Sequence, residues 1–290
     1  MIFIPAALAA CTTFFSGVIL SDITNFKVKH YRLKGNGLKR SVRFVQISDL
    51  HGVSYGEGNK RLIDAVKKLH PDFVIMSGDI MSADVLLAKH MPKSVDVAET
   101  LISGLSLHHK IYFGLGNHEQ KPQWFPDEFG IPFDVMMERF SKAGAIILDN
   151  STVYREAEGI SISGLSLPRK NYQKFDRIQL RLNEMEDILE RPSEKYYKIL
   201  IAHNPEYNDI YSDWGADLTL SGHYHGGIMQ MPGGKGVVSP RLEFFPDHTG
   251  GYYHTGGHDQ IVSRGLGYHT FPVRVFNPGE LVCVDLVPSS

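Results

Sequence analysis

Side chains of metal-binding type recur in five short motifs along this chain of 290 residues. The motifs contain Asp49 and His51, Asp79, Asn117 with His118 and Glu119, His203, and His223 with His225. Neither of the two cysteines, Cys11 and Cys283, belongs to a motif. Oxygen and imidazole ligands without sulfur suit Mn, Fe, Zn, Co or Ni, and the residue types do not choose among these divalent ions.

Each motif lies at the end of an apolar segment that has the character of a β-strand. We predict these strands at 42–48, 72–78, 111–115, 196–203 and 216–222. Apolar residues with helical spacing at 59–70 connect the first two strands, which indicates a βαβ unit with parallel strands. Further helices are expected at 94–106, 133–143 and 177–190, and short strands near 261–263, 273–276 and 281–286. The pattern predicts an α/β domain, parallel in its first half and more antiparallel later.

The position of the motifs matters more than any one of them. A Gly-Asp or Asp-x-His sequence alone is explained by an ordinary turn, and a single histidine by a hydrogen bond to the backbone. In open α/β sheets, however, functional groups gather beyond the carboxyl ends of the parallel strands. Because all five motifs occur at such ends, we expect them to form one metal site.

The series of motifs resembles that of the calcineurin-like metallophosphoesterases, and the resemblance covers roughly residues 43–286. The segment 262–280 also resembles the bacterial membrane-associated branch of that family, whose members hydrolyse phosphodiester or pyrophosphate bonds. The resemblance implies a four-layer α/β fold, in which a mixed β-sandwich is flanked by helices.

The resemblance also implies a role for each residue at a centre of two divalent metal ions. Asp79 would bridge the ions, with Asp49, His51 and His225 on one ion and Asn117, His203 and His223 on the other. A hydroxide bridging the ions would attack phosphorus. His118, as an imidazolium, would protonate the leaving group. Glu119 would orient the loop or the imidazole.

The N-terminal part of the chain differs in composition from the rest. Residues 1–21 contain no charged side chain, and we expect an apolar membrane anchor or a signal, or else a buried apolar element. Residues 22–43 form a basic connecting segment and the first strand, and the catalytic domain would occupy 44–290. Residues 1–43 carry a formal charge of +6, which leaves −8 on the remainder of a chain whose total is −2.

This charge distribution bears on the partners of the protein. A basic segment beside an apolar one favours a membrane surface, whereas a body of negative charge disfavours nucleic acid. Aromatic residues in loops near the motifs could form a wall for a lipid or a nucleobase; they are Trp124, Phe125, Phe244, Phe245, Tyr252 and Tyr253. We therefore expect a phosphoester substrate, with a lipid-linked one favoured, and a membrane-associated body on the extracytoplasmic side or otherwise in the cytoplasm.

Other functions remain open at this point. A phosphomonoesterase or protein phosphatase would need the same metal ligands. A non-enzymatic scaffold on the same fold would be expected to lose ligands or the acid, and Asp79, Asn117 and His118 are all present.

Overall fold

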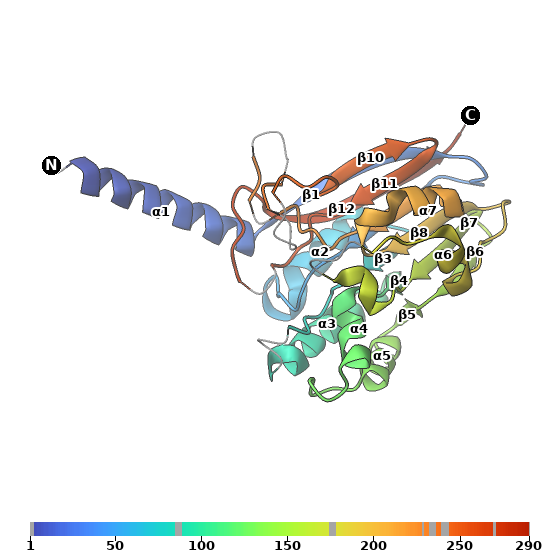
Figure 1. Ribbon diagram of the computed structural model, residues 1–290, viewed down its shortest axis with the longest axis horizontal. Helices are drawn as coiled ribbons and strands as arrows, with labels where there is room; N and C mark the ends of the chain where they lie inside the picture. The colour runs from blue at the N-terminus through green and yellow to red at the C-terminus, as the bar shows by residue number, and fades with distance from the viewer. Residues whose placement is uncertain are drawn as a thin grey trace.

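Two six-stranded β-sheets pack face to face, and helices cover their outer faces (Figure 1). The computed structural model describes residues 3–84, 89–173, 178–227, 229–231, 236–238, 244–268 and 271–289, with side chains from residue 9 onwards. The predicted four-layer arrangement, a mixed β-sandwich flanked by helices, is confirmed.

The first sheet has the order β1-β12-β2-β3-β4-β5. Its strands are β1 (Phe26–Gly35), β12 (Gly279–Pro288), β2 (Val42–Ile47), β3 (Phe73–Ser77), β4 (Lys110–Gly114) and β5 (Ala145–Leu148). Strands β2 to β5 are parallel, β12 is antiparallel to β2, and β1 is parallel to β12. The amino end of β1 therefore lies at the same edge as the carboxyl ends of β2, β3 and β4.

The second sheet has the order β10-β11-β9-β8-β7-β6. Its strands are β10 (Gly251–Thr255), β11 (His258–Val262), β9 (Leu218–Ser221), β8 (Tyr197–Ala202), β7 (Ile160–Leu165) and β6 (Ser151–Arg155). Strands β7, β8, β9 and β11 are parallel. The expectation of a more antiparallel second half is confirmed in part. Strand β6 is antiparallel to β7, β10 to β11, and β12 to β2, whereas the helices that connect β7 to β8 and β8 to β9 as crossovers keep those strands parallel.

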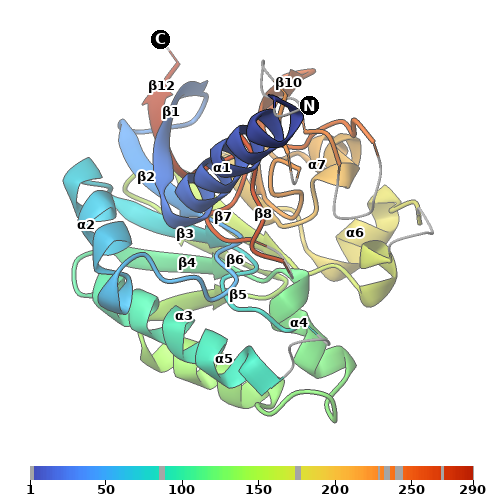
Figure 2. The ribbon, with the colours of Figure 1, turned by 90° about the vertical axis from the view of Figure 1, so that its left-hand side faces the viewer.

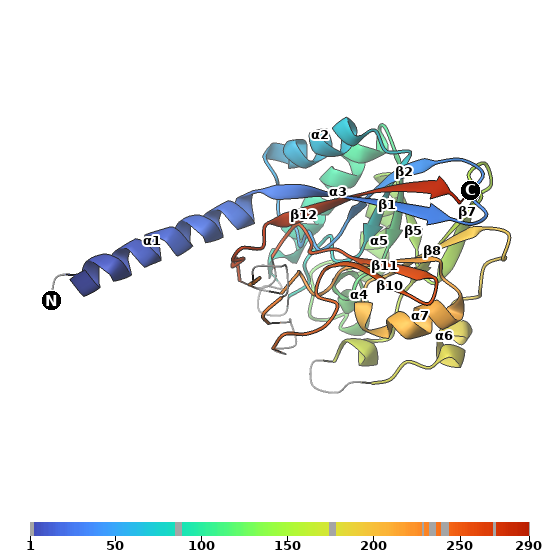
Figure 3. The same cartoon turned by 90° about the horizontal axis from the view of Figure 1, so that it is seen from above.

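Alternating side chains of the strands build the layers. On β2, Phe44 faces the second sheet, whereas Val45 faces the helices α2 (Lys60–Leu69), α3 (Met91–Ser106) and α5 (Phe133–Lys142). Helices α6 (Leu182–Ile188) and α7 (Asn208–Trp214) cover the second sheet through a core that contains the buried Trp214. Figure 3 shows α2 on one outer side and α6 with α7 on the other.

Two predicted elements differ from those observed. The strand expected at 273–276 is wrong: Val275 forms only an isolated bridge with Met229, and the Arg274 guanidinium is buried among backbone carbonyls instead. The helix expected at 177–190 begins at Leu182, because Arg181 is extended and its N–H donates to the Glu184 carboxylate at 3.0 Å. Residue 177 lies outside the described residues.

Helix α1 (Phe3–Thr24) leaves the body as a separate arm (Figures 1 and 2). Its side chains at 9–17 are exposed. Its last turn is attached to the body through the buried Asp22 carboxylate, which accepts the Asn277 N–H at 2.8 Å. None of the described helices combines the length and the apolar character that crossing a bilayer requires.

Candidate metal centre

The predicted site residues all lie just beyond the carboxyl ends of five strands. Asp49 and His51 follow β2, Asp79 follows β3, Asn117 and His118 follow β4 at the start of α4 (Asn117–Trp124), His203 follows β8, and His223 and His225 follow β9. All of these side chains are buried except that of His223, which is half-buried. The structure therefore brings the eight residues to one place.

Asp79 lies at the middle of this group. Its Oδ2 atom is 3.1 Å from His203 Nε2, 3.8 Å from His51 Nε2 and 3.9 Å from His118 Nε2. Its Oδ1 atom accepts the His118 N–H at 2.8 Å. One carboxylate oxygen thus faces imidazoles from three different strand ends.

Two sets of potential ligands adjoin each other at this point. Asp49, His51 and His225 form one set, and Asp79, His203 and His223 form another, each with ligand atoms within 4.8 Å of one another. In the first set, the Nε2 atoms of His51 and His225 are 3.0 Å apart, and Asp49 Oδ1 is 3.4 Å from His225 Nε2. Ligands about 2 Å from a shared ion are separated by roughly 3 Å, so these spacings fit metal coordination.

The orientation of the donors also fits metal binding. The Nδ1 atom of His203 lies 2.8 Å from the Ser77 carbonyl, which fixes a proton on Nδ1 and directs Nε2 into the centre. Among the described residues, Asn117 Oδ1 is buried and accepts no hydrogen bond. An amide oxygen buried in this way is suited to a cation. The clustered histidines and aspartates are therefore suited to divalent ions.

The backbone of the centre is unusual. Five of the seven predicted ligands have positive φ angles: Asp49 (49°), His51 (49°), Asp79 (55°), His223 (70°) and His225 (52°). Such conformations cost of order 1–3 kcal/mol each for residues with a side chain and cluster at functional sites.

Two glycines permit the close approach of backbone to the carboxylates. A Cβ atom on Gly116 would lie 2.2 Å from Asp79 Oδ1, and one on Gly222 would lie 2.2 Å from Asp49 Oδ2. Each glycine directly precedes a predicted ligand. The Gly-Asn and Gly-His pairs in the motifs therefore have a steric reason.

Glu119 holds the loop after β3 in place. Its fully buried carboxylate accepts the N–H groups of Asp79 (2.8 Å), Ile80 (2.8 Å), Met81 (3.2 Å) and Gly116 (2.9 Å). We expected Glu119 to orient either the loop or the imidazole of His118. Its carboxylate binds the loop and not the imidazole.

Buried acids set the electrostatics of the centre. Burial acts most strongly on Asp79, but the neighbouring histidines, His203 first, outweigh it and hold the pKa of Asp79 well below its usual range. Burial raises the pKa of Asp49 to about 6. Burial lowers the pKa of His203, yet the Asp79 and Asp49 carboxylates outweigh that effect and raise the pKa to about 10. The carboxylates therefore attract positive charge into the site.

His118 presents its Nε2 atom to the centre. Its Nδ1 atom accepts the Ala83 N–H at 2.9 Å and therefore carries no proton, which places the ring proton on Nε2. This contact favours a neutral imidazole, whereas we expected an imidazolium from the sequence.

Lys121 is a further residue of the site that the motifs did not indicate. Its Nζ atom donates to the Ala83 carbonyl at 2.9 Å and lies 3.4 Å from His118 Nε2. The signal that would have found it is its position three residues after His118, on the same face of a helix that begins at Asn117.

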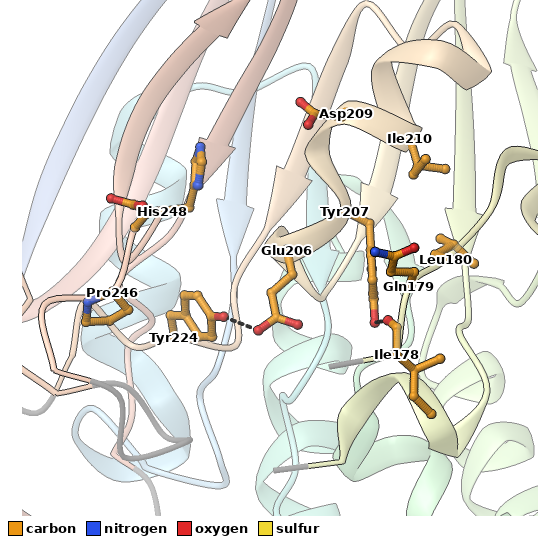
Figure 4. Close-up of a pocket in the computed structure, with 11 residues that line it drawn as sticks. Ile178, Gln179, Leu180, Glu206, Tyr207, Asp209, Ile210, Tyr224, Pro246 and His248 are labelled. Atoms are coloured by element: carbon orange, nitrogen blue, oxygen red, sulfur yellow. Dashed lines mark hydrogen bonds between the residues drawn. The ribbon is translucent and has the colours of Figure 1, made fainter. Parts of the chain in front are cut away.

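A pocket of about 500 Å³ lies against the loops that follow β8 and β9 (Figure 4). Tyr224, which lies between His223 and His225, donates its hydroxyl to Glu206, three residues after His203, and both line the pocket. The other lining residues are Ile178, Gln179, Leu180, Tyr207, Asp209, Ile210, Pro246, Asp247 and His248. The pocket thus has one wall made of the loops that carry the histidines.

The aromatic residues expected to form an apolar wall are dispersed. Phe244 and Phe245 are exposed, whereas Trp124 packs against Tyr172 and Phe125 lies under Arg169. Tyr252 and Tyr253 belong to strand β10 and not to a loop.

Comparisons with known proteins bear on the family to which the chain belongs. The chain matches the family described as calcineurin-like phosphoesterase over residues 42–227. It is 27% identical over 247 residues to the uncharacterized metallophosphoesterase YkuE of Bacillus subtilis, covering 84% of this chain and 78% of the relative. An uncharacterized metallophosphoesterase of Aquifex aeolicus is 25% identical over 268 residues, which are 90% of this chain and 91% of the relative. Among solved structures, the sulfate thiohydrolase SoxB of Thermus thermophilus has a TM-score of 0.45 at 11% identity, covering 90% of this chain and 58% of SoxB.

A two-sheet scaffold whose strand ends gather histidines and aspartates around a buried carboxylate defines a metal-dependent hydrolase. With the family match over 42–227, the chain belongs to the calcineurin-like phosphoesterases and is a metal-dependent phosphoesterase.

The four hydrogen bonds that the Glu119 carboxylate accepts lead to a stability prediction. In Glu119→Gln an amide NH₂ would face two of the four backbone donors, and we expect the free energy of unfolding to fall by about 2–4 kcal/mol. Urea denaturation with a chelator present measures this change without a contribution from metal binding. The matched control is Glu138→Gln, at a glutamate whose side chain is 62% exposed. Equal losses of unfolding free energy in the two variants would contradict the stabilising role of Glu119.

Proposed function

We propose that this chain hydrolyses phosphodiester or pyrophosphate bonds at a centre of two divalent ions. The observation that carries the proposal is the convergence of six potential ligands, from four strand ends, around Asp79. We assign one ion to Asp49, His51 and His225, the other to Asn117, His203 and His223, and the bridge to Asp79. Asp79 clusters both with His203 and His223 of one set and with His51 of the other, which supports the bridge. When bound, the ions neutralise charge on the phosphoryl oxygens and activate the attacking water.

We propose that His118 assists the departure of the leaving group. Its Nε2–H is directed into the centre because Ala83 occupies Nδ1, so it can donate to the leaving oxygen as negative charge develops there. Lys121 places a positive charge beside this donor and supports the same step electrostatically.

The pocket supports a substrate with an organic group on each side of the phosphorus. Because Tyr224 and Glu206 belong to ligand-bearing loops, a phosphoryl group at the centre lies close to the pocket, which can receive one such group. The apolar segment 1–21 and the basic residues at 22–43 support a membrane-associated domain acting on a lipid-linked phosphoester.

A substrate screen tests the proposed function. The full chain with Mn²⁺ is assayed on bis-p-nitrophenyl phosphate, on the monoester and on a lipid-linked pyrophosphate. We expect turnover of the diester or the pyrophosphate, abolished by EDTA and restored by added metal. Turnover of the monoester alone would favour a phosphomonoesterase or protein phosphatase, and a metal-loaded protein without turnover would favour a scaffold.

The bridging role of Asp79 predicts a change in metal content. Asp79→Asn keeps the shape of the side chain but removes the negative charge shared by the two ions, so we expect fewer than two ions per chain by elemental analysis. The control Asp64→Asn changes an aspartate whose side chain is 43% exposed and pairs with Lys60. Two ions per chain in both variants would remove the bridging assignment.

The role of His118 predicts a dependence on the leaving group. His118→Ala should retain metal and lose about 10²–10⁴-fold in kcat on esters with poor leaving groups, with a smaller loss on p-nitrophenyl esters. The comparison variant is His108→Ala, at an exposed histidine that precedes the amino end of β4, at the edge of the sheet opposite to the ligands. Losses of the same size on good and poor leaving groups would refute assistance to the leaving group.

A further inference from the structure

Exposed apolar side chains gather in the loops that follow His225. The exposed fractions are 75% for Phe244, 73% for Phe271 and 49% for Phe276. Backbone bridges join Met229 to Val275 and Val238 to Phe244, so the loops lie together. We call this surface the loop patch; its exposed residues are Met229, Met231, Phe244, Phe245, Phe271, Val273 and Phe276. A contiguous patch of this kind marks a surface that binds something apolar.

Helix α1 continues the loop patch. The rings of Phe14 and Phe15 lie 6.4 and 6.2 Å from that of Phe276. Figures 1 and 3 show α1 leaving the body beside these loops, which are coloured orange to red. Because α1 exposes its side chains at 9–17, with Phe14 and Phe15 among them, it has the character of a helix covered by protein or lipid.

The strand directions place this surface at the edge that carries the metal centre. Strand β1 starts just after α1, with Phe26 paired to Gly279 of β12. Strand β12 is antiparallel to β2, and Gly267 and Leu266 donate to the carbonyls of Asp49 and Ser48 where β2 ends. The base of α1 and the metal centre therefore share one edge of the sheet.

Hydrogen bonds attach the loop patch to a predicted ligand. The buried Asn277 amide donates to the carbonyls of His225 (2.7 Å) and Gly227 (2.6 Å), and its N–H donates to Asp22 of α1. Pro246, which lines the pocket, directly follows the exposed Phe245. A partner that covers the loop patch is thereby placed next to both the pocket and the metal centre.

Basic residues at the base of α1 indicate the nature of that partner. Lys27 and Lys29 are exposed on one face of β1. Arg61 donates to the Thr24 carbonyl at 3.2 Å and to Asn25 Oδ1 at 3.0 Å. Cationic side chains beside exposed aromatic and apolar ones match the headgroups and the acyl boundary of an anionic lipid surface.

We propose that the loop patch and α1 together dock on an anionic lipid surface and hold the metal centre toward it. The loops thus add a second membrane contact beside that of the N-terminal helix. The exposed side chains are the evidence for docking itself. The use of docking to present a lipid-linked phosphoester to the centre rests on the proposed function.

Co-sedimentation of the full chain with vesicles of phosphatidylglycerol and phosphatidylcholine tests the docking. In Phe244→Ser/Phe271→Ser, with α1 intact, we expect the lipid concentration for half-maximal binding to rise about tenfold or more. The matched control is Leu107→Ser: Leu107 is 78% exposed and precedes the amino end of β4, at the opposite edge of the sheet. Its binding should equal that of the wild type, and all binding should weaken without phosphatidylglycerol.

Three outcomes would overturn the proposal. They are a wild-type chain that does not sediment with the vesicles, a double variant that binds as well as the control, and a lipid-free dimer that the double variant abolishes, which would assign the patch to a second copy. Thermal melts establish that each variant is folded. Turnover of bis-p-nitrophenyl phosphate by the wild type without lipid tests the hydrolase separately, so failure of docking and failure of the function are distinguished.

Discussion

The buried carboxylate of Asp79 is the interaction on which the site depends. A carboxylate without water around it is stable only beside positive charge or hydrogen-bond donors, and Asp79 faces His51, His118 and His203 together. Its own N–H is held by Glu119, which also holds the turn before Asn117. A shift at the end of β3 would therefore move the Asp79 carboxylate, the His118 imidazole and the Asn117 amide at once.

The spacing of the candidate ligands depends on how the two sheets meet. His203 comes from the second sheet and lies against the Ser77 carbonyl of the first. Just beneath the centre, the buried Gln46 amide donates to Ser77 Oγ at 2.8 Å and to the Ser221 carbonyl of β9 at 3.0 Å. These bonds join β2, β3, β8 and β9 at the level where their ligands emerge, so the sandwich itself sets the geometry of the site.

The sequence could predict the part of this arrangement that is local. The strands before Asp49, Asp79 and Asn117 are short apolar segments. Because parallel strands bring their carboxyl ends to one edge of a sheet, the sequence could predict that these three side chains lie close together. The order and direction of the second sheet depend on which strands pair across long separations, which the apolar pattern does not contain. At 273–276, Val273 and Val275 alternate as in a strand, but Arg274 between them is occupied by the carbonyls of Arg264 and Asn277. Such a role for an arginine is visible only once the loops are assembled.

Hydrogen bonds from neighbouring segments hold the strained turns of the site in place. Positive φ angles at Asp49, Asp79 and His225 are unfavourable unless surrounding contacts fix them. Glu119 fixes the turn at Asp79, Gly267 bonds to the Asp49 carbonyl, and Asn277 bonds to the His225 carbonyl. Because Asn277 also binds Asp22, the same residue supports a predicted ligand and the base of the apolar helix. The arm is thus part of the structure that holds the centre, and not an appendage on a flexible linker.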